Sequence, residues 1–580
     1  RIHRKGRAGY NRDAFRAFGK QMFHGAHQLT RLRYAVDLDE ALNAMEKEAQ
    51  SAPDPVRAGM VVNEMNRRHQ FTMNPTNAAW TQRFSSAAFV WHLAMSPAAA
   101  AVNLSQTTVV GIPVMAAAFP KQGVKRASAE LSKALADFGR GRGWAEQSKS
   151  LTADERAAML EAYRRGTIDK SQAHDLAGVG ETGIEYSARR EQVMRVLSFM
   201  FHHAERLNRE VTFLAAYRMA KADGLTGDAA FQRAADLAWK VHFDYQSSSK
   251  PRFMQGDFQK VLFTFRNFTT NMLWRLFRDS HQALVGADAE TRAMARSQLI
   301  GLTGSMMFHA GIRGTWGYGI IMMLAGLFFP GGDDEAEEEL KRLLVGNPDD
   351  AGAVASIRRN LGGMMLNGVP GHLGGLSLSE RIGMPNLWFR GSDKNLEGRD
   401  AYYSFLDDLL GPSFGLISVP FEAMSAMKEG HIERGIDKAM PDFIRKLMQS
   451  GRYLWEGVTT WNGDDLIPEI TMQQAFVQAL GFTPAEVAER YQANRRMMNK
   501  QERLMTQRGG IQKEAAKAII AGERLSQRTL DRINAWNREY PEYPITPQSI
   551  RQSVGARLRA SQRNEYGIAL NPRLNDRIRR

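Results

Sequence analysis

A stretch without charged residues constrains the fold more than any other feature of the sequence. Residues 85–120 contain no Lys, Arg, Asp or Glu, although 24% of the chain is charged. A bilayer-spanning helix needs about 20 apolar residues, so this stretch is long enough to cross a membrane. A helix tends to end just before a proline, and Pro97, Pro113 and Pro120 all fall here. We therefore expect a helix that breaks at Ser96-Pro97, then a second short helix and a turn.

Polar side chains in the middle of this stretch leave its role open. They are Asn103, Ser105, Gln106, Thr107 and Thr108. One interpretation is a buried helical hairpin within a large core. The other is a segment that packs against protein in one state and enters lipid in another.

A second apolar stretch runs from Leu299 to Pro330, where only His309 and Arg313 can carry charge. Its small residues would let neighbouring backbones approach closely, as in the packing of membrane helices. A lone charge in lipid costs about 2.5 kcal/mol or more, so the stretch is a poor static span. It could form half a span, a channel-facing helix in an oligomer, or a buried hairpin. The candidate membrane or channel residues are Gly311, Arg313, Gly314, Trp316 and Tyr318.

Length and composition limit the number of domains, the cysteine chemistry and the kinds of partner. The chain has 580 residues, which predicts two to four domains at about 150 residues each. It has no Cys, which excludes disulfides, thiolate metal sites and a Cys nucleophile. A net charge of +15 favours polyanionic partners, either nucleic acid or an anionic membrane face. Because the sequence begins with Arg1, we expect a segment of a longer polypeptide or a processed product.

Helical spacing of apolar residues dominates, so the sequence predicts a mainly α protein. We expect an elongated assembly of many helices in several domains, with little or no β-sheet. The domains predicted are a basic N-terminal arm and helices (1–84), a helical core with the two apolar stretches 85–120 and 299–330 (85–345), an irregular Gly/Pro-rich junction (346–398), a helical domain (399–483) and a basic helical C-terminal tail (484–580).

Several helices are predicted with definite limits. Asp228 is expected to cap the helix over 227–242. Residues 1–34 are expected to form a solvated arm or a connection to upstream sequence. A capping box at Thr483–Glu486 should open a helix that breaks at Gly509-Gly510. The helices predicted are 37–49, 125–138, 152–163, 189–223, 227–242, 257–284, 484–507, 526–538 and one that starts at 546.

The sequence motifs that would indicate a cofactor or metal site lack the structural context that such sites need. Residues 178–183 fit the G-x-G-x-x-G pattern, but no strand precedes them, so a dinucleotide site is rejected. His202 and His203 are adjacent and therefore point to different sides of a helix, which argues against a metal site. We expect no enzyme activity, no catalytic residue, no cofactor and no metal.

Positive charge is concentrated in the tail. Residues 484–580 hold 20 Lys or Arg against 10 Asp or Glu, a net +10 of the total +15. A Gly-Arg run at 139–143 could also touch phosphate backbones, although a flexible basic loop explains it equally. The candidate DNA-binding residues are Arg140, Arg142, Arg557, Arg559, Arg573, Arg577, Arg579 and Arg580.

A series of short pieces, in order between residues 85 and 490, carries a family resemblance. The pieces are Ser96-Pro97, Asn103-Leu104-Ser105-Gln106, Gly111-Ile112-Pro113, Glu205-Arg206-Leu207-Asn208-Arg209-Glu210, Ala215-Ala216-Tyr217, Lys250-Pro251-Arg252, Phe265-Arg266-Asn267-Phe268 with Asn271, and Leu480-Gly481-Phe482-Thr483-Pro484-Ala485-Glu486. In them the chain resembles the large phage proteins with a PLxRFG domain, which overlap with the internal virion or ejection proteins of short-tailed phages. One departure is that no literal Pro-Leu-x-Arg-Phe-Gly tag occurs here.

The resemblance implies a structural protein carried in the virion interior. Such a protein leaves the capsid with or before the DNA and reassembles in the host cell envelope, at the periplasm and inner membrane, as part of a DNA conduit. The implied partners are double-stranded DNA bound without sequence preference, other internal virion proteins and the portal, the host inner membrane, and further copies of the chain. The alternatives are a peptidoglycan-cleaving lytic transglycosylase fragment and a cytosolic nucleic-acid-binding protein.

Overall fold

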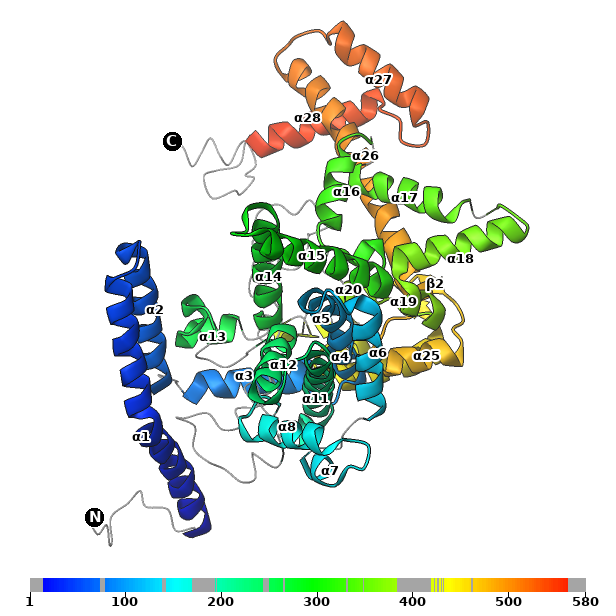
Figure 1. The fold of residues 1–580 in the computed structure, drawn as a ribbon. Coiled ribbons are helices and arrows are strands. Elements are labelled where there is room, and N and C mark those ends of the chain that lie inside the picture. Colours follow the sequence, from blue (N-terminus) through cyan, green and yellow to red (C-terminus); the bar gives the residue numbers. More distant parts are fainter. Residues whose placement is uncertain are drawn as a thin grey trace. The chain divides into compact units, whose positions relative to one another are not determined.

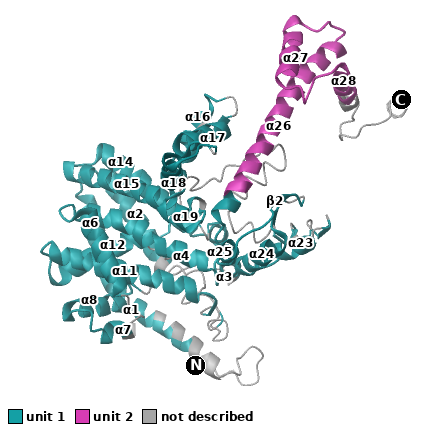
Figure 2. Cartoon of the chain, turned by 90° about the vertical axis from the view of Figure 1, so that its right-hand side faces the viewer, with its two compact units in different colours: residues 1–488 teal, residues 489–580 magenta. Residues whose placement is uncertain are grey.

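The protein is mainly α-helical, as the sequence predicts (Figure 1). The computed structural model describes residues 14–73, 79–137, 142–168, 193, 196–243, 250–263, 266–329, 332–347, 349–382, 419–421, 423–424, 427–428, 430, 432–460 and 463–561. In these ranges the sheet content is one two-stranded antiparallel hairpin, β1 (Val458–Thr459) with β2 (Asp465–Ile467). The chain divides into two compact units, residues 1–488 and residues 489–580 (Figure 2).

The first unit begins with a helical hairpin, α1 (Ala14–Gln50) and α2 (Pro55–Met73), whose helices pack along each other. The helix predicted over 37–49 therefore begins earlier, at Ala14, and the predicted arm over 1–34 is helical from that residue onward. Pro53 and Pro55 do mark the turn, and Pro55 takes the first helical position, where its missing N–H costs nothing.

The main core of this unit is built around α11 (Phe199–Ala222) (Figure 1). This helix packs against α4 (Pro97–Gln106), α6 (Gly123–Ala136), α8 (Ala153–Arg164) and α12 (Gly227–His242). Every residue from 208 to 217 is buried, which means that neighbours cover α11 on all sides. The α12 limits agree with the predicted 227–242, but Asp228 is not its cap: Thr226 holds that position, and Asp228 pairs with Arg165 instead.

The chargeless stretch forms α3 (Ala79–His92), α4, a π-helix η1 (Thr107–Gly111) and α5 (Ile112–Ala118). The predicted break at Ser96-Pro97 is confirmed, because Pro97 starts α4 and the Ser96 hydroxyl accepts from the Ala99 N–H. Pro113 does not end the helix. The π-turn directly before it absorbs the hydrogen bond that a proline cannot donate, so Pro97–Ala118 runs as one helical segment.

The helices after α12 form a second layer of the same unit. The single helix predicted over 257–284 is split into α13 (Asp257–Leu262) and α14 (Asn267–Val285), and α14 then packs along α15 (Ala289–Ala310). Among the shorter elements, α7 (Arg142–Gln147) packs on α8, whereas the 3-10 turns η2 (Arg252–Met254) and η3 (Ile312–Gly314) contact α13 and α15.

The predicted irregular junction is helical where it is described. After α16 (Tyr318–Gly326) and α17 (Gly332–Val345) come α18 (Ala353–Asn367), α19 (Val369–Gly374) and α20 (Ser379–Ile382). The many glycines of this segment lie at helix ends and at tight helix contacts: a Cβ on Gly362 would lie 2.4 Å from the Leu344 carbonyl oxygen of α17. Composition suggested a loop, but these glycines allow close packing.

The rest of the first unit contains α23 (Ile432–Lys438), α24 (Asp442–Glu456), the β-hairpin and α25 (Met472–Ala479). The second unit consists of most of α26 (Ala485–Ile520), with α27 (Gln527–Glu539) and α28 (Pro547–Ser561). Its core contains Ile511, Ala515, Ile533, Trp536 and Ile550. The predicted break at Gly509-Gly510 is wrong, because α26 continues through both glycines.

Candidate functional site

The candidate channel residues lie where the end of α15 meets the end of α18. Gly311 has φ +71°, and a Cβ there would lie 2.1 Å from the Leu366 carbonyl oxygen. The contact is reciprocal, because Gly368 has φ +80° and its Cβ would lie 2.4 Å from the His309 carbonyl oxygen. The two helix ends thus abut through glycine backbone. Gly311 therefore allows a close backbone contact inside the chain, and its role in a membrane or channel stays a prediction.

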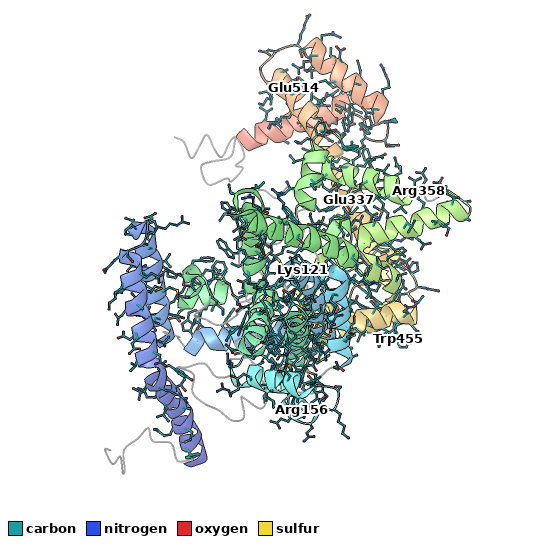
Figure 3. The ribbon with its side chains drawn as sticks, in the orientation of Figure 1. Lys121, Arg156, Glu337, Arg358, Trp455 and Glu514 are labelled. Carbon is teal, nitrogen blue, oxygen red and sulfur yellow. The ribbon has the colours of Figure 1, made fainter. Side chains whose placement is uncertain are left out.

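Arg313 is held inside the protein. It is 7% exposed, and its Nη2 lies 2.7 Å from Glu337 Oε1 of α17 (Glu337 is labelled in Figure 3). Its Nη1 donates to Asn367 Oδ1 of α18 at 3.2 Å. The sequence interpretation, in which Arg313 faces a wet lumen, does not describe this conformation. Its charge joins η3, α17 and α18, and the neighbouring Gly314 is buried.

The two aromatic candidates differ in exposure. Trp316 is 41% exposed, and its Nε1 donates to Thr303 Oγ1 at 3.1 Å. Tyr318, at the start of α16, is 8% exposed. The structure therefore brings Gly311, Arg313 and Gly314 into one packed turn, with Trp316 at its edge.

A solvent-exposed apolar face follows directly on α16. The exposed fractions are 62% for Ile320, 58% for Ile321, 51% for Leu324, 77% for Leu327 and 86% for Phe328. Their spacing places the first three on one side of the helix, and the side chains after its end extend the patch. No charged residue occurs between 318 and 329. We refer to these five residues as the α16 face.

A second exposed apolar stripe lies on α18 and was missed by sequence reasoning. It consists of Val354, Ile357, Leu361 and Met365, all largely exposed. The spacing of three, four and four residues is that of one helix face. This periodicity is visible in the sequence, but the Gly and Pro content of 346–398 concealed it. Since α16 packs on α17 and α17 on α18, both apolar faces belong to one group of three helices.

The polar residues of the chargeless helix are bonded to other helices. Asn208 of α11 donates to the Asn103 carbonyl oxygen at 2.7 Å and accepts from Thr107 Oγ1 at 2.7 Å. The Thr108 hydroxyl lies 3.1 Å from His309 Nε2 of α15, and Gln106 Nε2 donates to the Val241 carbonyl oxygen at 2.9 Å. Burial lowers the pKa of His309. This polar belt therefore fixes Pro97–Ala118 in the core.

Among the described residues, one helical segment is long and apolar enough to cross a bilayer. It is Pro97–Ala118, and half of its apolar window is buried inside the protein. A core helix meets the same criterion, so the length and apolarity of this segment agree with both interpretations of the stretch. The stretch 299–330 forms no single span, because η3 separates α15 from α16.

Only some of the candidate DNA-binding residues lie in the part of the chain that the structure describes. Arg142 starts α7 in the first unit, and Arg557 is half-buried on α28 in the second, where Arg559 also lies. Arg140 and Arg573, Arg577, Arg579 and Arg580 lie outside the described residues. The second unit presents further exposed basic side chains that were not singled out from the sequence. They are Arg495, Lys500, Lys513, Lys517, Arg524, Arg528, Arg532, Arg538 and Arg551.

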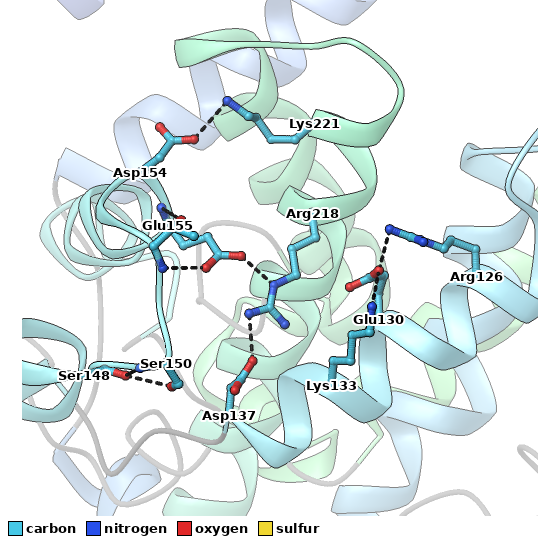
Figure 4. A network of polar contacts seen from close by, with 11 residues as sticks. Arg126, Glu130, Lys133, Asp137, Ser148, Ser150, Asp154, Glu155, Arg218 and Lys221 are labelled. Carbon is cyan, nitrogen blue, oxygen red and sulfur yellow. Dashed lines mark hydrogen bonds and ion pairs between the residues drawn. The ribbon is translucent and has the colours of Figure 1, made fainter.

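A polar cleft of about 510 Å³ opens between α6, α8 and α11. Arg218 Nε lies 2.7 Å from Glu155 Oε1, and its Nη2 lies 2.7 Å from Asp137 Oδ2 (Figure 4). Lys221 bonds Asp154 at 3.0 Å, which lowers the pKa of that carboxyl, and Tyr217 has its pKa raised by burial and by Asp154 to about 12. Sequence reasoning missed this network, because its members are spread over residues 126–221.

Within the described ranges, no group of three His, Asp or Glu side chains is placed to hold a metal ion. No family model, curated protein or solved structure matches the chain.

Proposed function

We propose that the chain is a structural internal virion protein that leaves the capsid and helps to form a conduit for phage DNA across the host cell envelope. The α16 face is the observation that carries the proposal. Five large apolar side chains, each more than half exposed, leave an apolar surface in water that a lone chain would not keep without cost. A protein that meets lipid or further subunits in its working state has a use for such a face.

The positions of the resembling pieces support a structural role. Asn103 and Gln106 in one piece and Asn208 in another belong to the polar belt that joins α4 to α11 and α12. Glu205, Asn208, Arg209 and Glu210 are each at most 3% exposed, and the Arg209 Nη2 donates to the Phe243 carbonyl oxygen. These residues of the resembling pieces thus hold core helices together, which suits a structural role.

The proposed partners follow from charge and apolar surface. The exposed basic residues of the second unit suit double-stranded DNA without sequence preference. The α16 face and the α18 stripe suit the host inner membrane, other virion proteins including the portal, or further copies of the chain. The corresponding locations are the virion interior and then the periplasm and inner membrane of the host.

Electron microscopy of the purified chain, with and without anionic liposomes, tests this proposal. We expect rings or membrane-bound particles, together with flotation of the protein with the liposomes. A monomer that never associates with lipid would favour a cytosolic nucleic-acid-binding protein. Clearing of a peptidoglycan zymogram by the purified chain would favour the lytic transglycosylase alternative.

A further inference from the structure

Four basic and four acidic side chains line the cleft between α6, α8 and α11. Its four carboxylates are all engaged: Glu130 by Arg126 and Lys133, Asp137 and Glu155 by Arg218, and Asp154 by Lys221. A guanidinium group offers five N–H donors and an ammonium group three, so these contacts leave each basic side chain with further donors. A ligand that carries several acceptors would use these donors.

The charges in the cleft are unevenly distributed. Arg126 Nη2 and Lys133 Nζ converge on one oxygen, Glu130 Oε1, at 2.8 and 3.4 Å, and Glu130 is 2% exposed. Two cations around one buried carboxylate leave a net charge of about +1 at this end. At the other end Arg218 is shared by two carboxylates, Asp137 and Glu155, which leaves the reverse imbalance.

Arg218 faces both ends of the cleft. Its side chain is 14% exposed, and its Nη1 is buried with no hydrogen-bond partner among the described residues. Nη1 points to the side of the cleft where Glu130 and Lys133 lie (Figure 4). A buried guanidinium N–H without an acceptor costs stability, and an anion that displaces the side chains covering Nη1 would remove that cost.

We propose that this end of the cleft binds a small phosphate-type oxyanion between Arg126, Lys133 and Arg218 Nη1. A tetrahedral oxyanion supplies several acceptors at once, and hydrogen bonds between two charged groups are the strongest available here. The cleft has room for more than the ion, so the ligand is either free phosphate or the phosphate group of a small ester. This site is independent of the proposed role in DNA delivery.

Equilibrium dialysis of the full chain against radiolabelled inorganic phosphate, at ionic strength held constant with chloride, tests the site. We expect saturable binding of one phosphate per chain. R126Q and K133Q should each weaken binding about tenfold, because each removes a charged donor. Both side chains are about half exposed, at 48% and 61%, so the variants should keep the fold, which circular dichroism checks.

The matched control is K125Q, on the same helix but outside the cleft lining, which should bind phosphate like the parent. A second arm replaces phosphate with a nucleoside monophosphate, and tighter binding there identifies a phosphate ester as the ligand. Absence of saturable binding in both arms would overturn the proposal. An equal loss in K125Q and K133Q would also overturn it, since it would indicate diffuse attraction to a basic surface.

Discussion

The glycines at the junction of α15 and α18 are constrained by the backbone around them. Gly311 must have φ +71° and must leave room for the Leu366 carbonyl group. Gly317 also has a positive φ, +82°, but nothing lies within 4 Å of the position of its Cβ. A side chain at Gly317 would meet backbone strain alone, whereas one at Gly311 would meet both backbone strain and steric overlap.

Substituting alanine at both positions tests this difference. Gly317→Ala should lower the free energy of unfolding by about 1 kcal/mol, the cost of a positive φ for a residue with a Cβ. Gly311→Ala should cost roughly 3 kcal/mol or more, because its Cβ would overlap backbone that cannot move alone. Urea unfolding followed by circular dichroism measures both. Equal costs would mean that the contact with Leu366 is unimportant.

The lowered pKa of Lys446, on α24, should make the stability of the protein depend on pH. Burial, with help from Arg381 and Arg445, lowers the pKa of Lys446 to about 8 from its ordinary 10.5. The unfolded chain therefore binds more protons between those two values, and the free energy of unfolding should rise with pH across that window. Below pH 8 the charged ammonium should cost on the order of 3 kcal/mol.

The variant Lys446→Met keeps the aliphatic stem and removes the charge. It should unfold at higher urea concentration than the parent at pH 7, and the difference should disappear by about pH 10.5. Lys149→Met, at an exposed position, is the control. A parent and a variant with parallel pH profiles would contradict a lowered pKa for Lys446.

At the level of elements, the structure distinguishes the two apolar stretches, whose roles the sequence left open. The chargeless segment has the composition of a membrane span, but hydrogen bonds from α11, α12 and α15 hold it in the core. The shorter α16 is the one with exposed apolar side chains. A bilayer or a partner subunit would therefore meet α16 first.

The double variant I321E/L324E tests the α16 face. Both side chains are more than half exposed, so the fold should be retained, whereas two carboxylates on this face should reduce liposome permeabilisation at least tenfold. Val56→Glu, on α2 and 77% exposed, is the matched control and should leave permeabilisation unchanged. If the double variant permeabilises liposomes as well as the parent, the α16 face has no part in the conduit.

The polar belt is tested by Asn208→Ala. Asn208 is 2% exposed, and this change removes its hydrogen bonds to Asn103 and Thr107. It should lower the free energy of unfolding by about 2 kcal/mol. Asn43→Ala, at an exposed position of α1, should cost less than about 0.5 kcal/mol. Chemical denaturation of the three proteins side by side measures both, and similar costs would show that the belt does not stabilise the core.

At the level of the whole molecule, the basic charge and the apolar faces belong to different units. Residues 484–580 carry a net +10, from 20 basic and 10 acidic residues, whereas the α16 face lies in the first unit. DNA binding and lipid binding should therefore be separable by deletion.

Removing 484–580 should abolish most non-specific DNA binding and leave liposome binding in place. For the parent, log affinity for two unrelated duplexes should fall linearly with log salt, because phosphate contacts release counterions. Fluorescence anisotropy at several salt concentrations measures this slope. R140Q/R142Q in the full chain is the comparison, with a smaller expected loss. Unchanged affinity after the deletion would refute the role of the tail.

The sequence alone determined the fold class and most helix positions. The predicted 227–242, 152–163 and 526–538 agree with α12, α8 and α27 within a residue or two. The reason is that helix formation depends on local i→i+4 bonds, on side-chain periodicity and on caps, which neighbouring residues supply. The α18 stripe was also present as a periodic pattern, although the glycine content concealed it.

Only the tertiary structure decided which apolar surfaces are covered and which polar groups are satisfied. Asn208 lies far along the sequence from Thr107, and Glu337 lies well beyond Arg313, yet each pair shares a bond. Neighbouring residues also did not predict that the helices continue through Pro113 and Gly509-Gly510. The helix propensity of one or two residues contributes less free energy than the burial and hydrogen bonds of the whole helix. Burial depends on residues distant in sequence, so no local pattern could assign the chargeless segment to the core and α16 to the surface.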